Sequence, residues 1–197
     1  FHGDHGSTFI AGSWSRGITD FDLERAYKLI LKNATVPGPG GRQYMNEYIE
    51  KGWIADVDTV GSRFDEEFKA GVHKVLEYSY DDYATAQVAK ILGDEENYKR
   101  LMKQSQNYMN VFNPEIGFYC GRVDDGSWMR EFDPDQPYLN HMWREANAWN
   151  LLFYPVHEPE TLLAMYPSYE VVEAKLDTLF TRPWCGVEAE NISGFIG

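Results

Sequence analysis

The chain has 197 residues, of which 43% are hydrophobic and 15% aromatic, and its formal net charge is −13. This apolar content is enough for a folded core and excludes a disordered chain. The acidic balance argues against nucleic acid as a partner, because such a surface repels phosphate groups. No apolar run approaches the roughly 18 residues of a transmembrane helix, so no membrane span is expected. The two cysteines, Cys120 and Cys185, match no zinc or redox spacing and are either two thiols or one disulfide.

The first quarter of the chain alternates short helix signals with glycine- and proline-rich breaks. Gly17 and Gly52 follow apolar-periodic segments, and glycine is the typical residue just after a helix. Asp20 is a suitable N-cap for a segment in which apolar residues recur every three or four positions. We therefore expect helices over 7–16, 20–33 and 42–51, followed by a long loop over 53–71.

Residues 72–92 carry the strongest helix signal, because apolar residues cover more than half of the helix circumference. This coverage predicts a helix that is buried on two sides. His73, Glu77 and Asp81 follow one another in steps of four and share one face. They are either mutually supporting side chains, with His73 beside Glu77, or the polar lining of a cleft. The three alone are a thin ligand set for a metal.

A second long helix follows after a very short break. Asp94 is placed to cap a helix over 95–110, and two long helices joined by so short a loop must lie antiparallel. Residues 118–135 contain a turn and alternating aromatics, which predicts a loop or a short β-hairpin. Trp128 within it is either packing or a platform for a sugar ring. A last helix is expected over 169–180.

One acid, Glu145, lies in an aromatic-rich segment that is predicted to be helical from about residue 141 to Tyr154 and to end before Pro155. Partial burial among indole rings would raise the pKa of this carboxyl and keep it protonated, as a general acid requires. The helix N-terminus would favour the ionised form instead. The alternative is an acid that serves the helix dipole beside core tryptophans. Without a phosphate loop, nucleophile elbow or zinc helix, carboxylate chemistry is the main enzymatic possibility.

Several motifs in the same order resemble glycoside hydrolase family 92, the calcium-dependent exo-acting α-mannosidases. Residues 76–83 are similar to the family's Leu-Glu-Tyr-Ala-Tyr-Asp-Asp-Trp helix, and residues 144–150 to its Glu-Gly-Asn-Ala-Trp-Gln motif. Residues 154–158 resemble its Val-Pro-His-Asp turn, and segments within 17–27 and 192–197 also match. The resemblance covers nearly the whole chain, and its specificity comes from the agreement of separated motifs.

The resemblance implies an all-α fold, in which residues 1–197 are a partial (α/α)6 toroid belonging to one catalytic domain. It implies inverting hydrolysis of α-mannosides, with α-1,2 linkages expected, and Glu145 as the general acid. The catalytic base and the main calcium ligands would lie outside this chain, so the chain alone is expected to be inactive. The implied partners are a mannose-containing glycan such as an N-glycan and the remainder of the same catalytic domain. The implied location is secreted, periplasmic or at the cell surface.

The resemblance also implies roles for residues around the acid. Asn147 and Trp149 would bind substrate by shaping the site, and Glu77 and Asp82 would either line the cleft or be structural. Arg144 directly precedes the acid, and a nearby cation lowers the pKa of a carboxyl. Ala146 and Asn150 depart from the motif, where the family has Gly and Gln. The alternative function is a non-catalytic helical domain that binds glycan or a protein partner.

Overall fold

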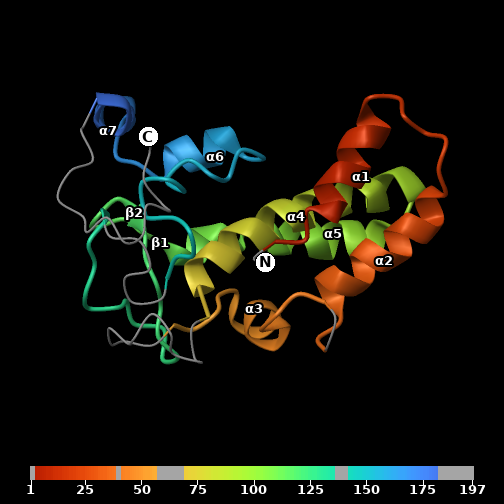
Figure 1. The fold of residues 1–197 in the computed structure, drawn as a ribbon, viewed down its shortest axis with the longest axis horizontal. Helices are drawn as coiled ribbons and strands as arrows, with labels where there is room; N and C mark the ends of the chain where they lie inside the picture. The colour runs from red at the N-terminus through yellow and green to blue at the C-terminus, as the bar shows by residue number, and fades with distance from the viewer. Residues whose placement is uncertain (1–2, 39–40, 57–68, 136–141, 182–197) are drawn as a thin grey trace. The chain divides into compact units, whose positions relative to one another are not determined.

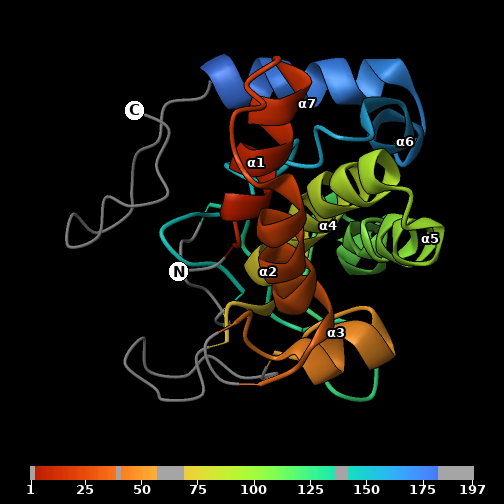
Figure 2. The ribbon, with the colours of Figure 1, turned by 90° about the vertical axis from the view of Figure 1, so that its right-hand side faces the viewer.

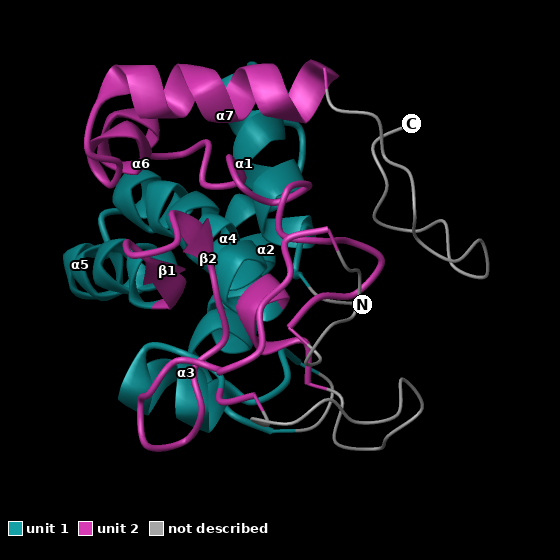
Figure 3. Ribbon diagram, turned by 90° about the vertical axis from the view of Figure 1, so that its left-hand side faces the viewer, with its two compact units in different colours: residues 1–54, 74–110 teal, residues 55–73, 111–197 magenta. Residues whose placement is uncertain are grey.

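The computed structural model describes residues 3–38, 41–56, 69–135 and 142–181. These residues are mostly helical, with one two-stranded sheet (Figure 1). The elements in order are α1 (Gly6–Ser15), α2 (Leu23–Thr35), α3 (Met45–Lys51), α4 (Gly71–Leu92), α5 (Glu95–Gln104), the 3-10 helix η1 (Asn107–Val111), β1 (Phe112–Asn113), β2 (Phe118–Tyr119), α6 (Pro159–Ala164) and α7 (Tyr169–Thr181). The chain divides into two compact units, residues 1–54 with 74–110 (unit 1) and residues 55–73 with 111–197 (unit 2) (Figure 3).

The helix ends of unit 1 follow the local signals closely. Gly17 and Gly52 adopt φ of 82° and 81° directly after α1 and α3, in the left-handed region that glycine tolerates. The cap of α2 is Asp22 rather than Asp20, since its side chain accepts a hydrogen bond from the Arg25 amide at 2.9 Å. The three short helices predicted for this part of the chain are therefore confirmed, with boundaries moved by a few residues.

The central helix α4 is buried along most of its length, as its all-round apolar pattern predicted. No residue from 71 to 89 is exposed. Gly93, with φ of 75°, ends α4, and Asp94 caps α5 by accepting from the Asn97 amide at 3.1 Å. Ala86 of α4 and Leu101 of α5 share one core cluster, which confirms the antiparallel hairpin that Figure 2 shows beside α2.

A second core cluster joins α2 to the C-terminal half of α4, and Ile10 and Trp14 of α1 pack against it. Phe9, next to Ile10 in the same helix, is 77% exposed. Ile10 and Trp14 are four residues apart and occupy the inner face of a ten-residue helix, so Phe9 points about 100° away from Ile10 and about 140° away from Trp14.

Unit 2 contains two short antiparallel pairings, of which only the second lies within residues 118–135, the segment predicted to be a loop or short hairpin. β1 pairs antiparallel with β2, with Phe112 opposite Tyr119, and a second turn at Gly126 brings Arg122 opposite Trp128. The predicted last helix is present as α7, whereas α6 was not predicted.

Cys120 is buried, which raises the pKa of its thiol to about 11, and Cys185 lies outside the described residues. Among the described helices, none combines the length and apolar character needed to cross a bilayer.

Candidate functional site

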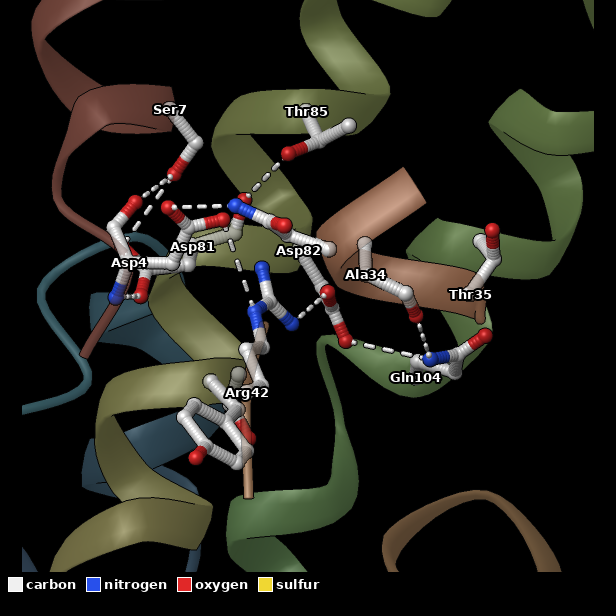
Figure 4. Close-up of polar contacts among 12 residues, drawn as sticks. Asp4, Ser7, Ala34, Thr35, Arg42, Asp81, Asp82, Thr85 and Gln104 are labelled. Carbon is white, nitrogen blue, oxygen red and sulfur yellow. Dashed lines mark hydrogen bonds and ion pairs between the residues drawn. The ribbon is translucent and has the colours of Figure 1, made fainter. Parts of the chain in front are cut away.

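Ionisable side chains from three segments of the sequence meet in unit 1, and those of Arg42 and of the three acids on α4 are buried (Figure 4). Two precede α1, one precedes α3 and three lie on α4. We call this set the charged cluster: Asp4, His5, Arg42, Glu77, Asp81 and Asp82. Glu77 and Asp81 lie about one helical turn apart on α4, so they share a face. Asp82, the next residue, points toward the neighbouring α3 and α5.

The centre of the charged cluster is an ion pair between Arg42 and Asp82, whose side chains are 1% and 0% exposed. Arg42 Nη1 donates to Asp82 Oδ1 at 2.5 Å, while the Tyr48 hydroxyl and Gln104 Nε2 donate to Oδ2 at 2.9 and 3.3 Å. Burial raises the pKa of Asp82 to about 6, and Arg42 opposes that rise by stabilising the carboxylate. Asp82 therefore ties α3 and α5 to α4, which favours the structural interpretation over the cleft-lining one.

His5 completes the polar stripe that was predicted on α4. Its Nε2 lies 2.6 Å from Glu77 Oε2, and its Nδ1 lies 3.3 Å from Asp81 Oδ1. The hydrogen bond with Asp81, together with the charges of Asp81, Glu77 and Asp4, raises the pKa of His5 to about 9, against an opposing effect of burial. His5 is therefore an imidazolium at neutral pH that holds the start of α1 on α4. His73, four residues before Glu77 on α4, accepts at its Nδ1 from the Arg144 amide at 3.4 Å.

A polar pocket of about 300 Å³ adjoins the charged cluster in unit 1. Its lining combines two glycines with polar side chains: Gly3, Asp4, Asn33, Gly41, Arg42, Gln43 and Tyr78. The Tyr78 hydroxyl is held by Gln43, accepting from its amide at 3.0 Å and donating to its carbonyl at 3.3 Å. The Arg42 guanidinium lies over the Tyr78 ring, 5.1 Å from its centre.

The predicted helix around Glu145 is wrong. Residues 142–157 form turns and bends, and Glu145 itself has φ of 51°, which a right-handed helix cannot include. The cause is local hydrogen bonding, because Asn147 Oδ1 accepts from the amides of Trp149 and Asn150 at 3.0 and 3.1 Å. Asn150 Oδ1 accepts from the Asn147 amide at 2.8 Å in return. Such side-chain bonds to the backbone compete with helix formation.

Glu145 is exposed, whereas Trp143 and Trp149, the tryptophans expected to surround it, are buried. Trp149 packs edge-on against Phe118 with ring centres 4.8 Å apart, and its Nε1 donates to Asp135 Oδ1 at 2.9 Å. The Lys175 ammonium lies 3.5 Å from the centre of the Phe118 ring, and burial lowers its pKa to about 8. The expectation of a carboxyl enclosed by indole rings is therefore not met in this chain. Glu145 instead projects from a loop that buried side chains hold in place.

Comparison with known proteins identifies the family of this chain. Residues 1–195 match the glycosyl hydrolase family 92 catalytic domain. The chain belongs to this family.

Solved family 92 structures share the fold. The α-mannosidase BT3965 of Bacteroides thetaiotaomicron is 28% identical with a TM-score of 0.76, covering 92% of this chain and 22% of its own. The inverting mannosidase BT2199 of the same species is 24% identical with a TM-score of 0.79, covering 99% of this chain and 25% of its own. An uncharacterised secreted glycosidase of Arthroderma benhamiae is 24% identical across 90% of this chain and 26% of its own. The chain thus spans about a quarter of the length of these relatives.

In this family 92 chain, sequence reasoning missed several residues of the charged cluster in unit 1 and of the Glu145 loop in unit 2. It singled out Glu77 and Asp81 on α4, and it considered His5 only as part of a polar loop that could bind a metal or a sugar hydroxyl. It did not pair His5 with the α4 acids, and it did not select Arg42 or Asp135. His5 and Arg42 lie in loops, where the sequence has no helical or strand periodicity. The one signal for Arg42 was its position directly after a glycine-rich break. Glu145, Asn147 and Trp149 come together in unit 2 through the Asn147 turn, and Glu77 and Asp82 lie together in the charged cluster of unit 1.

Proposed function

We propose that this family 92 chain is part of an exo-acting α-mannosidase in which Glu145 is the general acid. The supporting observation is the geometry of the 142–157 loop within a family match over residues 1–195. Glu145 is exposed there, while Asn147 and Trp149 on the same loop are buried and hydrogen-bonded. This position leaves the Glu145 carboxyl accessible to the oxygen of a departing sugar, and we propose that the enclosure a general acid requires comes from the remainder of the catalytic domain.

The reaction we propose is inverting hydrolysis, with α-1,2-linked mannosides, such as those of N-glycans, as substrates. Inversion requires a second carboxylate, roughly 6.5–9.5 Å from the acid, that activates water on the opposite face of the sugar. We place this base outside the 197 residues, so the chain alone should be inactive. We likewise propose that the chain is one portion of a single catalytic domain with an (α/α)6 toroid, for which the α4–α5 hairpin is a suitable building unit.

Asn147 and Trp149 act, in this proposal, as positioning residues. Their side chains are 0% and 6% exposed, so they influence the sugar through the conformation of Glu145 and not through a large contact area of their own. Glu77 and Asp82 stabilise the charged cluster of unit 1, because His5 binds the first and Arg42, with two further donors, binds the second.

Calcium is implied by the family resemblance. The described residues include no group of three or more His, Cys, Asp or Glu side chains that could hold a metal ion. They therefore do not fit a calcium site by themselves, and no step of the proposed reaction is assigned to the ion. A secreted, periplasmic or cell-surface location is proposed from the distant relative named as a secreted glycosidase.

The test is Glu145→Gln in the complete protein that contains this chain, measured as mannose release from an α-1,2-linked mannobiose. Loss of a general acid should lower kcat by about 10²- to 10⁴-fold. Glu160→Gln is the matched control, because Glu160 is an exposed acid in the first turn of α6 and should leave the rate unchanged. Proton NMR of the first product should show β-mannose if the reaction inverts.

Three results would each contradict a part of the proposal. An unchanged rate in Glu145→Gln would remove Glu145 from the chemistry. Mannoside binding without any hydrolysis by the complete protein would favour the alternative of a non-catalytic glycan-binding domain. Glu145-dependent mannose release by the 197-residue chain alone would refute the expectation that it is incomplete.

A further inference from the structure

The ammonium of Lys175, on α7, lies among the aromatic side chains that hold residues 142–157, the Glu145 loop. It is 3.5 Å from the centre of the Phe118 ring and 5.5 Å from the centre of the Trp149 ring. Both distances are within the roughly 6 Å over which a cation is attracted to the face of an aromatic ring. The two rings pack edge-on against each other, and Trp149 belongs to the Glu145 loop. Lys175 therefore connects α7 to that loop inside unit 2 (Figure 3).

Lys175 has no carboxylate partner among the residues that the structure describes. Burial lowers its pKa to about 8, and no neighbouring charge counteracts that fall. The side chains three and four positions away on α7, which share its face, carry no charge: Val171, Val172, Thr178 and Leu179. Removing an ammonium from water without a counter-ion is costly. The faces of Phe118 and Trp149 supply the compensation instead.

The turn between β1 and β2 is shaped to admit this side chain. Gly117 adopts φ of 65°, and a Cβ there would lie 3.1 Å from Lys175 Cε, which is closer than a normal contact. Residues 173, 174, 176 and 177 of α7 are exposed, so solvent is available on other sides of the helix. The Lys175 ammonium lies over the rings all the same, which indicates a built position and not a solvated lysine.

Trp149 links this position to the acid. Its amide donates to Asn147 Oδ1 at 3.0 Å, and its Nε1 donates to Asp135 Oδ1 at 2.9 Å. Asn147 sets the turn that follows Glu145, whose left-handed φ of 51° persists only while the surrounding structure holds it. A movement of the Trp149 ring would therefore be passed through Asn147 to the backbone of Glu145.

We propose that Lys175 is a positioning residue for Glu145, and that its ammonium fixes the pair of rings, Phe118 and Trp149, on which the Glu145 loop rests. Lys175 acts through the loop and does not touch the substrate. The proposal rests on the proposed function, because the position of Glu145 affects a reaction only if Glu145 is the general acid. The contact between Lys175 and Trp149 can be measured without any reaction.

The first test follows the ¹H–¹⁵N NMR signal of the Trp149 indole in the 197-residue chain, assigned with Trp149→Phe. Raising the pH through 8 neutralises Lys175, so this signal should shift with a midpoint near pH 8. The midpoint should be absent in Lys175→Met, which keeps a long stem but carries no charge. This comparison separates Lys175 from Asp135, which binds the indole, and from Tyr166, whose pKa burial raises.

The second test measures kcat and KM for an α-1,2-linked mannobiose in the complete protein that contains this chain. Lys175→Met should lower kcat by about 2- to 30-fold, the equivalent of one cation–π contact, and should leave KM within about twofold. Lys175→Arg should retain most of the rate, since arginine keeps the charge and also binds aromatic faces. A residue that served stability alone would not separate kcat from KM in this way.

Lys28→Met is the matched control, because Lys28 is exposed in the middle of α2 in unit 1. Its rate should equal that of the unchanged protein. If Lys175→Met does not fold, Lys175→Arg keeps the first test decisive. Arginine stays charged at every accessible pH, so the Trp149 signal of Lys175→Arg should show no midpoint near pH 8.

Four outcomes would overturn the proposal. They are no shift of the Trp149 signal near pH 8, the same shift in Lys175→Met, a Lys175→Met rate equal to that of Lys28→Met, and equal losses of rate in Lys175→Met and Lys175→Arg. Failure of the proposed function looks different. An unchanged rate in Glu145→Gln would remove the acid but leave the Trp149 titration intact, whereas any of the four outcomes beside an inactive Glu145→Gln would remove only the role of Lys175.

Discussion

Asp82→Asn is the most informative single substitution for the fold of unit 1. Asparagine keeps the volume of Asp82 and an oxygen for Tyr48 and Gln104, but it removes the charge that compensates Arg42. The next carboxylate, that of Asp4, lies 3.7 Å from Arg42 Nε. Breaking a buried ion pair from one side costs about 3–5 kcal/mol. Because Asp4 offsets part of the buried charge, we expect the lower value, about 3 kcal/mol.

The assay is urea unfolding at pH 7, followed by tryptophan fluorescence and circular dichroism. With a slope of about 1–3 kcal/mol per molar urea, a loss of about 3 kcal/mol lowers the midpoint by about 1–3 M. The variant should remain folded in water if the native chain has the usual stability of roughly 5–15 kcal/mol.

Asp22→Asn is the matched control for this charge removal. Asp22 is exposed and caps α2, and asparagine is about as good an N-cap as aspartate, so the loss should stay below about 0.5 kcal/mol. In an Arg42→Met background, Asp82→Asn should cost less, because no buried cation is left unpaired. A loss for Asp82→Asn no larger than that of Asp22→Asn would refute the reasoning that this ion pair joins α3, α4 and α5.

Two further predictions concern the start of α1 and the Glu145 loop. The pKa of His5 is raised from 6.5 to about 9, so its stabilising effect is complete below pH 6.5 and is lost as the pH rises through 9. The urea midpoint should fall across this range, and it should fall less in His5→Gln; equal falls in the two chains would show that His5 is not the group responsible. Asn147→Ala leaves the buried amide of Trp149 and the part-buried amide of Asn150 without their acceptor and should cost about 1–3 kcal/mol. An unchanged melting temperature would mean that the turn does not depend on this side chain.

Local interactions made much of the fold predictable. An N-cap contacts an amide three residues ahead, and a glycine after a helix acts within one turn, so residues such as Asp94 and Gly52 identify helix ends without tertiary information. The all-round apolar pattern of α4 was sufficient to predict its burial. The separated motifs around Glu77 and Glu145 were likewise sufficient to indicate the family, which the match over residues 1–195 confirms.

Contacts between distant segments decided the rest. His5 reaches Asp81 across 76 positions, and Arg42 reaches Asp82 across 40, so no window of sequence contains either pair. The segment around Glu145 has helical spacing, yet Asn147 turns its backbone and the contacts of Trp149 with Phe118 and Asp135 hold the turn in place. The sequence by itself therefore determined where helices begin and end and to which family the chain belongs. The tertiary structure alone decided which charges are buried together and how Glu145 is presented, because desolvation and ion pairing depend on distance in space and not on distance along the chain.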